Sequence, residues 1–156
     1  MANYMTRRQY DRHIAATKQC EEKLAAARKK VGEAASHGDL SENAEYDAAV
    51  EESGFLAGRV EELKSMLVGV QIVDPKNTVE GVATIGKTVE LQNVATGEKV
   101  KYQIVGNGSV DSDSGEVSFF APVGKALIGA RPTDTVRVAL PAGTASYLVL
   151  SVTISD

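Results

Sequence analysis

The chain has 156 residues, of which 43% are hydrophobic and 24% charged, with a net charge of −4 and one cysteine, Cys20. This balance is typical of a folded globular chain, and it argues against autonomous nucleic-acid binding, because each phosphate contact needs a cation. No apolar run approaches the roughly 20 residues that cross a bilayer, and the N-terminus has no signal-peptide core. A single cysteine excludes an internal disulfide. We therefore expect a cytoplasmic monomer with no membrane contact and no DNA binding of its own.

Residues 6–73 are free of proline and predict a helical hairpin. Apolar and small side chains recur there at alternating spacings of three and four, which is the rhythm of a coiled-coil seam. The first series is Tyr10, His13, Thr17, Cys20, Leu24, Ala27, Val31 and Ala34, and the second is Tyr46, Ala49, Ser53, Leu56, Val60, Leu63, Leu67 and Val70. Gly38 separates them, as glycine often does just past a helix. The larger side chains of the second series predict tighter packing at the base than at the tip.

Asp74-Pro75 predicts the end of the helical stretch, because the residue before a proline is pushed towards extended conformations. The spacing of apolar residues then changes to two, which indicates strands at 87–94, 100–105, 134–140 and 146–154. A proline followed by "VGKALIG" predicts one short helix in residues 122–129. The fold class is therefore α+β. We predict an antiparallel coiled-coil hairpin with an acidic tip over residues 1–75 and a small α+β domain over 76–156.

The candidate site is the predicted tip, "SHGDLSENAEYDAA", where Asp39 and Glu42 follow Gly38. One interpretation is a capping box, in which Asp39 accepts from the third helical N–H and Glu42 reaches back to the cap N–H. The other is metal binding, because two carboxylates one helical turn apart suit Mg²⁺ when a partner supplies the remaining ligands. Spacing alone leaves both interpretations open.

The tip sequence "HGDLSENAEYDAA", with "SGFLAGRVEELKSML" and "VQIVD" behind it, resembles the bacterial transcript cleavage factors of the GreA/GreB family. "MTRRQYDRH" and "APVGKALIGARPTDTV" resemble the opening and the C-terminal signature of that family. The resemblance implies a coiled-coil hairpin followed by an FKBP-like domain. It also implies that the hairpin enters the secondary channel of RNA polymerase and stimulates cleavage of the nascent RNA 3′ end by the polymerase, so the chain itself is not an enzyme.

In this resemblance the two tip acids, Asp39 and Glu42, are the catalytic and metal-binding residues. They would hold Mg²⁺ jointly with RNA polymerase, and the isolated protein would bind no cofactor. Ser41, Asn43 and Tyr46 are expected to support the tip. His13, His37 and Cys20 are interpreted as structural residues, because nothing nearby completes a site.

Four positions depart from the family pattern. Ala121 stands where serine is common, Ala130 where lysine is expected, Thr133 where glycine is expected, and Val50 where relatives can carry a basic residue. A basic run at residues 28–30 fits RNA contact or a solvated helix face equally well. These departures keep open a second hypothesis, a regulator that occupies the channel without promoting cleavage.

A third hypothesis is a prolyl isomerase or chaperone, which the FKBP-like domain suggests. Such a site needs a pocket lined by aromatic side chains. The C-terminal half offers Tyr102, Phe119, Phe120 and Tyr147. Fold alone does not give function, so the arrangement of these four side chains decides this hypothesis.

Overall fold

A computed structural model describes residues 3–36 and 44–154. Its contacts divide the chain into two compact units. The hairpin unit is Arg12–Val68, and the C-terminal unit combines the described residues up to Asp11 with those from Gly69 onward. This division differs from the predicted ranges 1–75 and 76–156, because the first residues of the chain pair with the C-terminal unit. No helix within the described ranges is long and apolar enough to cross a membrane.

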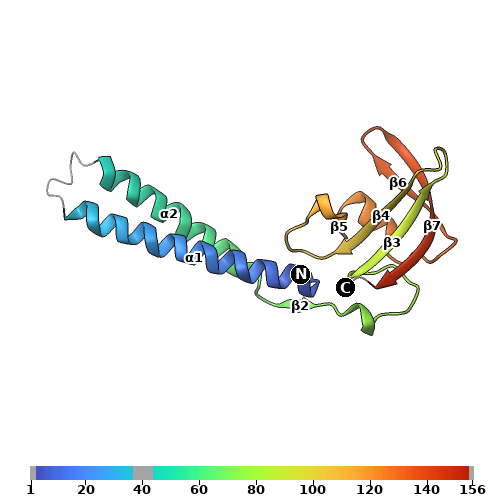
Figure 1. Cartoon of the computed structure of the whole chain (residues 1–156), viewed down its shortest axis with the longest axis horizontal. Coiled ribbons are helices and arrows are strands. Elements are labelled where there is room, and N and C mark those ends of the chain that lie inside the picture. Colours follow the sequence, from blue (N-terminus) through green and yellow to red (C-terminus); the bar gives the residue numbers. More distant parts are fainter. Residues whose placement is uncertain (1–2, 37–43, 155–156) are drawn as a thin grey trace. The chain divides into compact units, whose positions relative to one another are not determined.

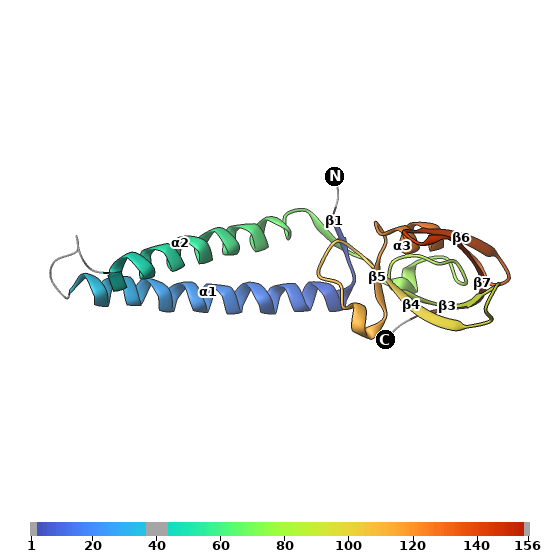
Figure 2. The same cartoon turned by 90° about the horizontal axis from the view of Figure 1, so that it is seen from above.

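Two long helices, α1 (Arg7–Ala35) and α2 (Ala44–Ser65), form the predicted hairpin and run side by side (Figures 1 and 2). The start of α1 is a capping box. The Gln9 backbone N–H donates to Thr6 Oγ1 at 3.1 Å, and Gln9 Oε1 accepts from the Thr6 N–H at 3.0 Å. The side chain of each residue thus accepts from the backbone N–H of the other at the helix N-terminus.

The predicted end of the helical stretch at Asp74-Pro75 is wrong. Helix α2 ends at Ser65, and Gly69 has a φ of 69°, a left-handed conformation that stops a helix and favours glycine. Val70, which the heptad spacing placed on the helical seam, lies instead in strand β2 (Val70–Ile72). Strand β2 pairs in parallel with β1 (Asn3–Met5), a strand that the sequence did not predict.

The C-terminal unit contains a curled five-stranded sheet in the order β5-β4-β3-β7-β6 (Figures 1 and 2). Its strands are β3 (Lys87–Asn93), β4 (Lys99–Val105), β5 (Glu116–Ser118), β6 (Thr135–Leu140) and β7 (Gly143–Ile154). The helix α3 (Pro122–Leu127) begins at its proline, and short 3-10 turns are η2 (Pro75–Asn77) and η3 (Ser112–Ser114). The four predicted strands and the short helix are confirmed, as is the α+β fold, whereas β5 was not predicted.

The core of this unit lies against one face of the sheet. Along β3 the alternate residues Lys87, Val89 and Leu91 are buried, as a half-buried strand requires. The other core residues are Ala83, Ile85, Ile104, Leu127, Ala130 and Val149. Lys87 is 2% exposed, and its Nζ donates to the Val79 carbonyl at 3.0 Å and to that of Val82 at 3.5 Å. Two backbone carbonyls therefore accept from the buried Lys87 side chain.

Thr133 occupies a turn position whose backbone conformation favours glycine. In the segment Arg131-Pro132-Thr133-Asp134 the Asp134 N–H donates to the Arg131 carbonyl at 3.0 Å, and Thr133 has a φ of 77°. Proline at the second position and a positive φ at the third are the features of a type II turn. Among the described residues Thr133 alone combines a side chain with a positive φ. A β-branched side chain is strained in that conformation.

We expect Thr133→Gly to raise the free energy of unfolding by about 1 kcal/mol, because the relief of strain exceeds the entropy that glycine adds to the unfolded chain. Thr135→Gly in β6 is the control and should lower the free energy of unfolding, since the backbone there is extended. Urea denaturation of the full chain measures both. A loss of stability in Thr133→Gly would contradict a strained turn.

Candidate functional site

The described part of the candidate site is the stem beneath the tip. Helix α1 ends at Ala35, and Ser36 closes its last turn. The Ser36 N–H lies within 3.3 Å of the Gly32 and Glu33 carbonyls, and the Ser36 Oγ donates to the Glu33 carbonyl at 2.6 Å. Helix α2 begins at Ala44 and carries Glu45 and Asp47 in its first turn. Acids there favour the positive end of the helix dipole. The stem therefore brings negative charge to the start of α2.

Most of the predicted site residues lie outside the described residues. These are Asp39, Ser41, Glu42 and Asn43, together with His37 and Gly38. The choice between a capping box and metal binding therefore remains a prediction. Tyr46 is described and is half-buried in α2. Its support of the tip also stays a prediction.

The two helices bury larger apolar side chains at their base than near the tip. The cluster at the base consists of Cys20, Leu24, Val60 and Leu63, with Leu56 and Ala57 against it. Towards the tip the buried residues are the alanines Ala27, Ala34 and Ala49. Small side chains let two helix backbones approach closely but bury little apolar area. The stem is consequently slender near the tip and stabilised mainly from its base.

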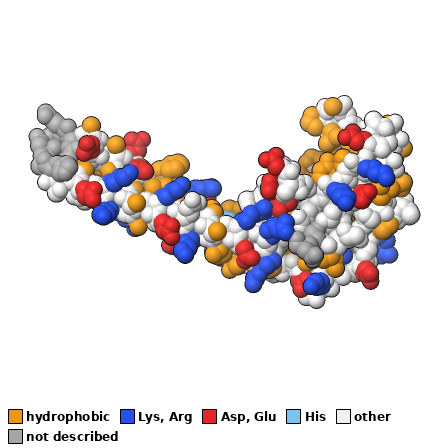
Figure 3. All heavy atoms as spheres, in the orientation of Figure 1, with side chains coloured by type: hydrophobic (Ala, Val, Ile, Leu, Met, Phe, Trp, Pro, Cys, Tyr) orange, Lys and Arg blue, Asp and Glu red, His pale blue; other side chains and the backbone are white. Residues whose placement is uncertain are grey.

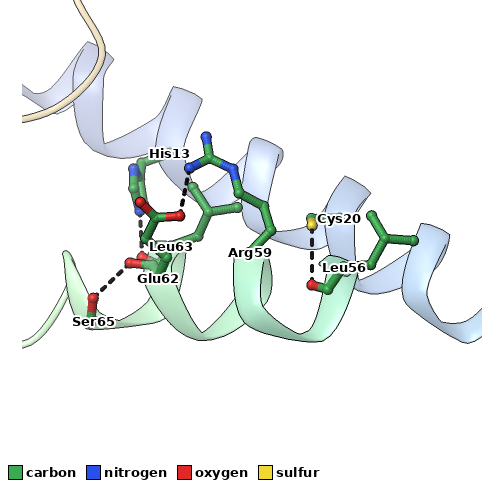
Figure 4. Close-up of polar contacts among 7 residues, drawn as sticks. All are labelled: His13, Cys20, Leu56, Arg59, Glu62, Leu63 and Ser65. Atoms are coloured by element: carbon green, nitrogen blue, oxygen red, sulfur yellow. Dashed lines mark hydrogen bonds and ion pairs between the residues drawn. The ribbon is translucent and has the colours of Figure 1, made fainter. Parts of the chain in front are cut away.

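Polar contacts join the two helices at the base (Figure 4). His13 is 4% exposed and its Nε2 lies 2.6 Å from the Leu63 carbonyl, which can only accept, so Nε2 carries the proton. Cys20 Sγ lies 3.9 Å from the Leu56 carbonyl of α2, whereas Thr17 Oγ1 donates to the His13 carbonyl at 2.8 Å within α1. The structural roles predicted for His13 and Cys20 fit these positions on the seam.

A hollow of about 500 Å³ lies on the stem close to the tip. It is lined by Lys30, Glu33, Ala34, Ser36, Glu45, Ala48, Ala49 and Glu52. Three glutamates face one lysine there, and Figure 3 shows acidic and basic side chains alternating along the exposed surface of the hairpin unit. The side chains that line this hollow therefore include more acids than bases.

The described residues do not form a complete metal site. Within residues 3–36 and 44–154 no three His, Cys, Asp or Glu side chains are grouped so that they could hold an ion. Oxygen donors from Asp39 and Glu42 are of the kind that Mg²⁺ prefers, but two carboxylates are too few to enclose it. The donor set therefore fits an ion shared with a second molecule.

Three of the four aromatic side chains considered for a pocket pack against the core, and the fourth, Phe120, is exposed. Tyr102, Phe119 and Tyr147 pack against the core cluster, and the Phe119 ring also lies 3.9 Å from that of Phe120. Two hollows of about 420 and 400 Å³ on this unit have no aromatic side chain in their lining. Neither of these two hollows therefore provides the aromatic-lined pocket that a prolyl isomerase needs.

The four departures from the family pattern have distinct surroundings. Ala121 is the N-cap of α3 and makes no side-chain capping bond, as expected where alanine replaces serine. Ala130 is 6% exposed in the core, where its carbonyl accepts from the Ala83 N–H at 2.8 Å. Thr133 strains its turn, and Val50 is an exposed apolar residue on α2. The first three therefore bear on the stability of the C-terminal unit.

Sequence reasoning missed a buried amide at the start of α1. Gln9 is fully buried and joins the first turn of α1 to the loop at residues 106–109. The pattern Thr6-x-x-Gln9 is a capping-box signature and could have placed the N-terminus of α1. No local pattern announces the bonds to a loop about a hundred residues away.

Comparisons with known proteins match most of the chain. A family model described as "Transcription elongation factor, N-terminal" matches residues 3–72, and one described as "Transcription elongation factor, GreA/GreB, C-term" matches residues 75–154. The protein called transcription elongation factor GreA of Pelobacter propionicus is 46% identical over 122 residues, which is 78% of this chain and 77% of that protein. That of Trichlorobacter lovleyi is 44% identical over 122 residues, with the same coverage of 78% and 77%. Among solved structures, GreA factor homolog 1 of Thermus thermophilus is 25% identical over 97% of this chain and 99% of its own, with a TM-score of 0.46.

Proposed function

The chain belongs to the GreA/GreB family of transcription elongation factors, and from this membership we propose that it acts on RNA polymerase. In this proposal the hairpin enters the secondary channel of the polymerase and stimulates cleavage of backtracked nascent RNA. The observation that carries it is the sequence between α1 and α2, which holds Asp39 and Glu42 at the end of a long helical hairpin.

The slender stem supports this proposal. A segment that enters a narrow passage needs a small cross-section, and two helices whose contact is made by Ala34 and Ala49 can lie close together. The apolar seam lies inside the hairpin, and the face of the hairpin unit seen in Figure 3 carries many charged side chains among hydrophobic ones. The hairpin can therefore keep its fold in an aqueous channel, where an open apolar face would not be stable.

The two tip acids would complete a site to which the polymerase contributes the other ligands. A Mg²⁺ ion bound in this way would supply an activated water and would stabilise the negative charge that develops on phosphate. Asp39 and Glu42 would each present a carboxylate oxygen from one short segment. Because the two acids are close in sequence, one binding event would bring both carboxylates to the site. The entropic cost of bringing the ligands together would then be met when the hairpin binds. The reaction remains that of the polymerase.

We expect the purified protein to shorten the RNA in stalled, backtracked elongation complexes that carry 5′-labelled transcript. The shortening should depend on Mg²⁺ and should be absent from complexes that have not backtracked. Binding to the polymerase is measured in parallel. Intact binding with unshortened RNA and slowed nucleotide addition would instead establish a channel regulator that does not promote cleavage. The exposed Val50, which stands where relatives can carry a basic residue, keeps this alternative open.

A further inference from the structure

Lys87 is a buried cation without an acidic partner in the described part of the chain. It is the first residue of β3 and is 2% exposed. A lysine is rarely buried unless an acid pairs with it, because water no longer stabilises its charge there. The ion pairs formed within residues 3–36 and 44–154 do not include Lys87. No carboxylate of those residues therefore offsets its charge at close range.

The hydrogen bonds of this ammonium also leave one donor over. An ammonium group has three N–H donors. Lys87 Nζ donates to the Val79 carbonyl at 3.0 Å and to the Val82 carbonyl at 3.5 Å, and the second bond is long and therefore weak. The side chain makes no further hydrogen bond to the described residues. One donor is thus available for an acceptor that those residues do not supply.

Lys87 lines a hollow of about 400 Å³ that lies wholly within the C-terminal unit. This volume is at the lower end of the range in which proteins bind small molecules. The charged residues of the lining are Lys76, Glu80 and Lys87, so the lining carries one net positive charge. Lys76 and Glu80 are exposed and screened by water, whereas the charge of Lys87 is buried and acts more strongly at short range. The hollow therefore favours a ligand with a single negative charge.

The other side of the hollow is apolar. The sheet register places Ile154 of β7 directly opposite Lys87, and Val152 lies on the same face two residues earlier. Both line the hollow, together with Pro75. Ile154 is 44% exposed, so a large apolar side chain stands uncovered across from the ammonium. A ligand with an anionic end and an apolar body would satisfy both features.

We propose that this hollow is a binding site for a small carboxylate with a branched apolar body. The carboxylate would accept from Lys87 Nζ, and the apolar body would pack against Pro75, Val152 and Ile154. A hydrogen bond between two opposite charges is stronger than one to a neutral carbonyl, particularly away from water. The site goes beyond the proposed function, because the hollow involves neither the hairpin unit nor RNA or RNA polymerase.

The test is a titration of the isotope-labelled full chain with 3-methylbutanoate, followed by the NMR shifts of its backbone amides. Saturable shifts are expected at Val79, Val82, Lys87 and Val152. The neutral amide 3-methylbutanamide has the same shape and should bind at least about tenfold more weakly, because it lacks the charge. Acetate should bind about fivefold more weakly than 3-methylbutanoate, because it lacks the apolar body.

Variants of the full chain identify the residue responsible. Lys87→Met keeps the length of the side chain without its charge and should weaken binding of 3-methylbutanoate by at least about tenfold. Lys99→Met is the matched control, since Lys99 is an exposed lysine on β4, and its affinity should stay within about twofold of wild type. Glu80→Gln removes the acid of the lining and should tighten binding by about twofold. That variant leaves Lys87 in place, so it tests the site even if Lys87→Met does not fold.

Three results would overturn the proposal. They are an absence of saturable shifts in wild type, equal affinity of a folded Lys87→Met protein, and equal affinity for the acid and its amide. Inorganic phosphate that binds more tightly than 3-methylbutanoate would overturn the assignment to a carboxylate. Because the titration contains no RNA and no polymerase, failure of this site leaves the proposed function standing, and failure of the cleavage assay leaves this site standing.

Discussion

Asp39→Asn and Glu42→Gln should each lower the stimulated cleavage of backtracked RNA by about 100-fold or more, while binding to RNA polymerase stays intact. Loss of a residue that only orients a metal ligand already costs about 10- to 100-fold, and loss of a ligand should cost at least as much. Binding should survive because the contact surface of a long hairpin lies mostly outside two side chains. The measurement is the rate of shortening of 5′-labelled RNA, with polymerase binding followed in the same samples.

If the two acids bind metal, the free energy of unfolding should change by no more than about 1 kcal/mol in either variant, because asparagine remains a good N-cap. The capping interpretation predicts the reverse for the same variants, a modest loss of helix stability with unchanged cleavage. Glu45→Gln is the matched control, because Glu45 is an exposed carboxylate in the first turn of α2 and lies outside the pair. Raised Mg²⁺ should partly restore a single variant, since mass action refills a weakened site. Wild-type cleavage by the double variant would leave the two acids as a helix cap.

Gly106→Ala should destabilise the protein by more than about 3 kcal/mol, or prevent its folding, because the added methyl group meets backbone rather than a flexible side chain. A Cβ at residue 106 would overlap the Tyr4 carbonyl oxygen and would lie 2.9 Å from the Met5 Cα. The segment cannot move aside cheaply, since Met5 is fully buried and its carbonyl accepts from the Val73 N–H at 2.9 Å. Thermal unfolding followed by circular dichroism measures the effect.

Gly58→Ala is the control for this prediction and should have the opposite sign. Gly58 is an exposed residue within α2, and a Cβ there would meet nothing within 4 Å. Alanine in a helix interior is favoured over glycine by about 1 kcal/mol, so this variant should be slightly more stable than wild type. A Gly106→Ala protein as stable as wild type would show that residues 4–5 can shift away from the loop.

Local patterns in the sequence were sufficient for much of this architecture. The heptad spacing from His13 to Ala34 and from Ala49 to Leu63 predicted the two helices, because a helix records its buried face in side chains that recur every three or four residues. Alternation likewise predicted β3, β4, β6 and β7. The acids Asp39 and Glu42 were assigned to the tip from their order in the chain, and the motif around them carried the resemblance to the family.

Other features depended on partners far away in the chain. Val70 continues the heptad spacing, yet residues 70–72 form β2, because they pair in parallel with β1, which local spacing cannot reveal. Strand β5 has three residues, too few for a pattern, and exists by pairing with β4. Gln9 looked like an ordinary polar residue near a helix start, but the fold places it against Gly106 and Ser109. Periodicity specifies which face of an element is apolar. A short strand or a buried amide is instead stabilised by the groups that satisfy its hydrogen bonds, and only the tertiary structure brings those groups together.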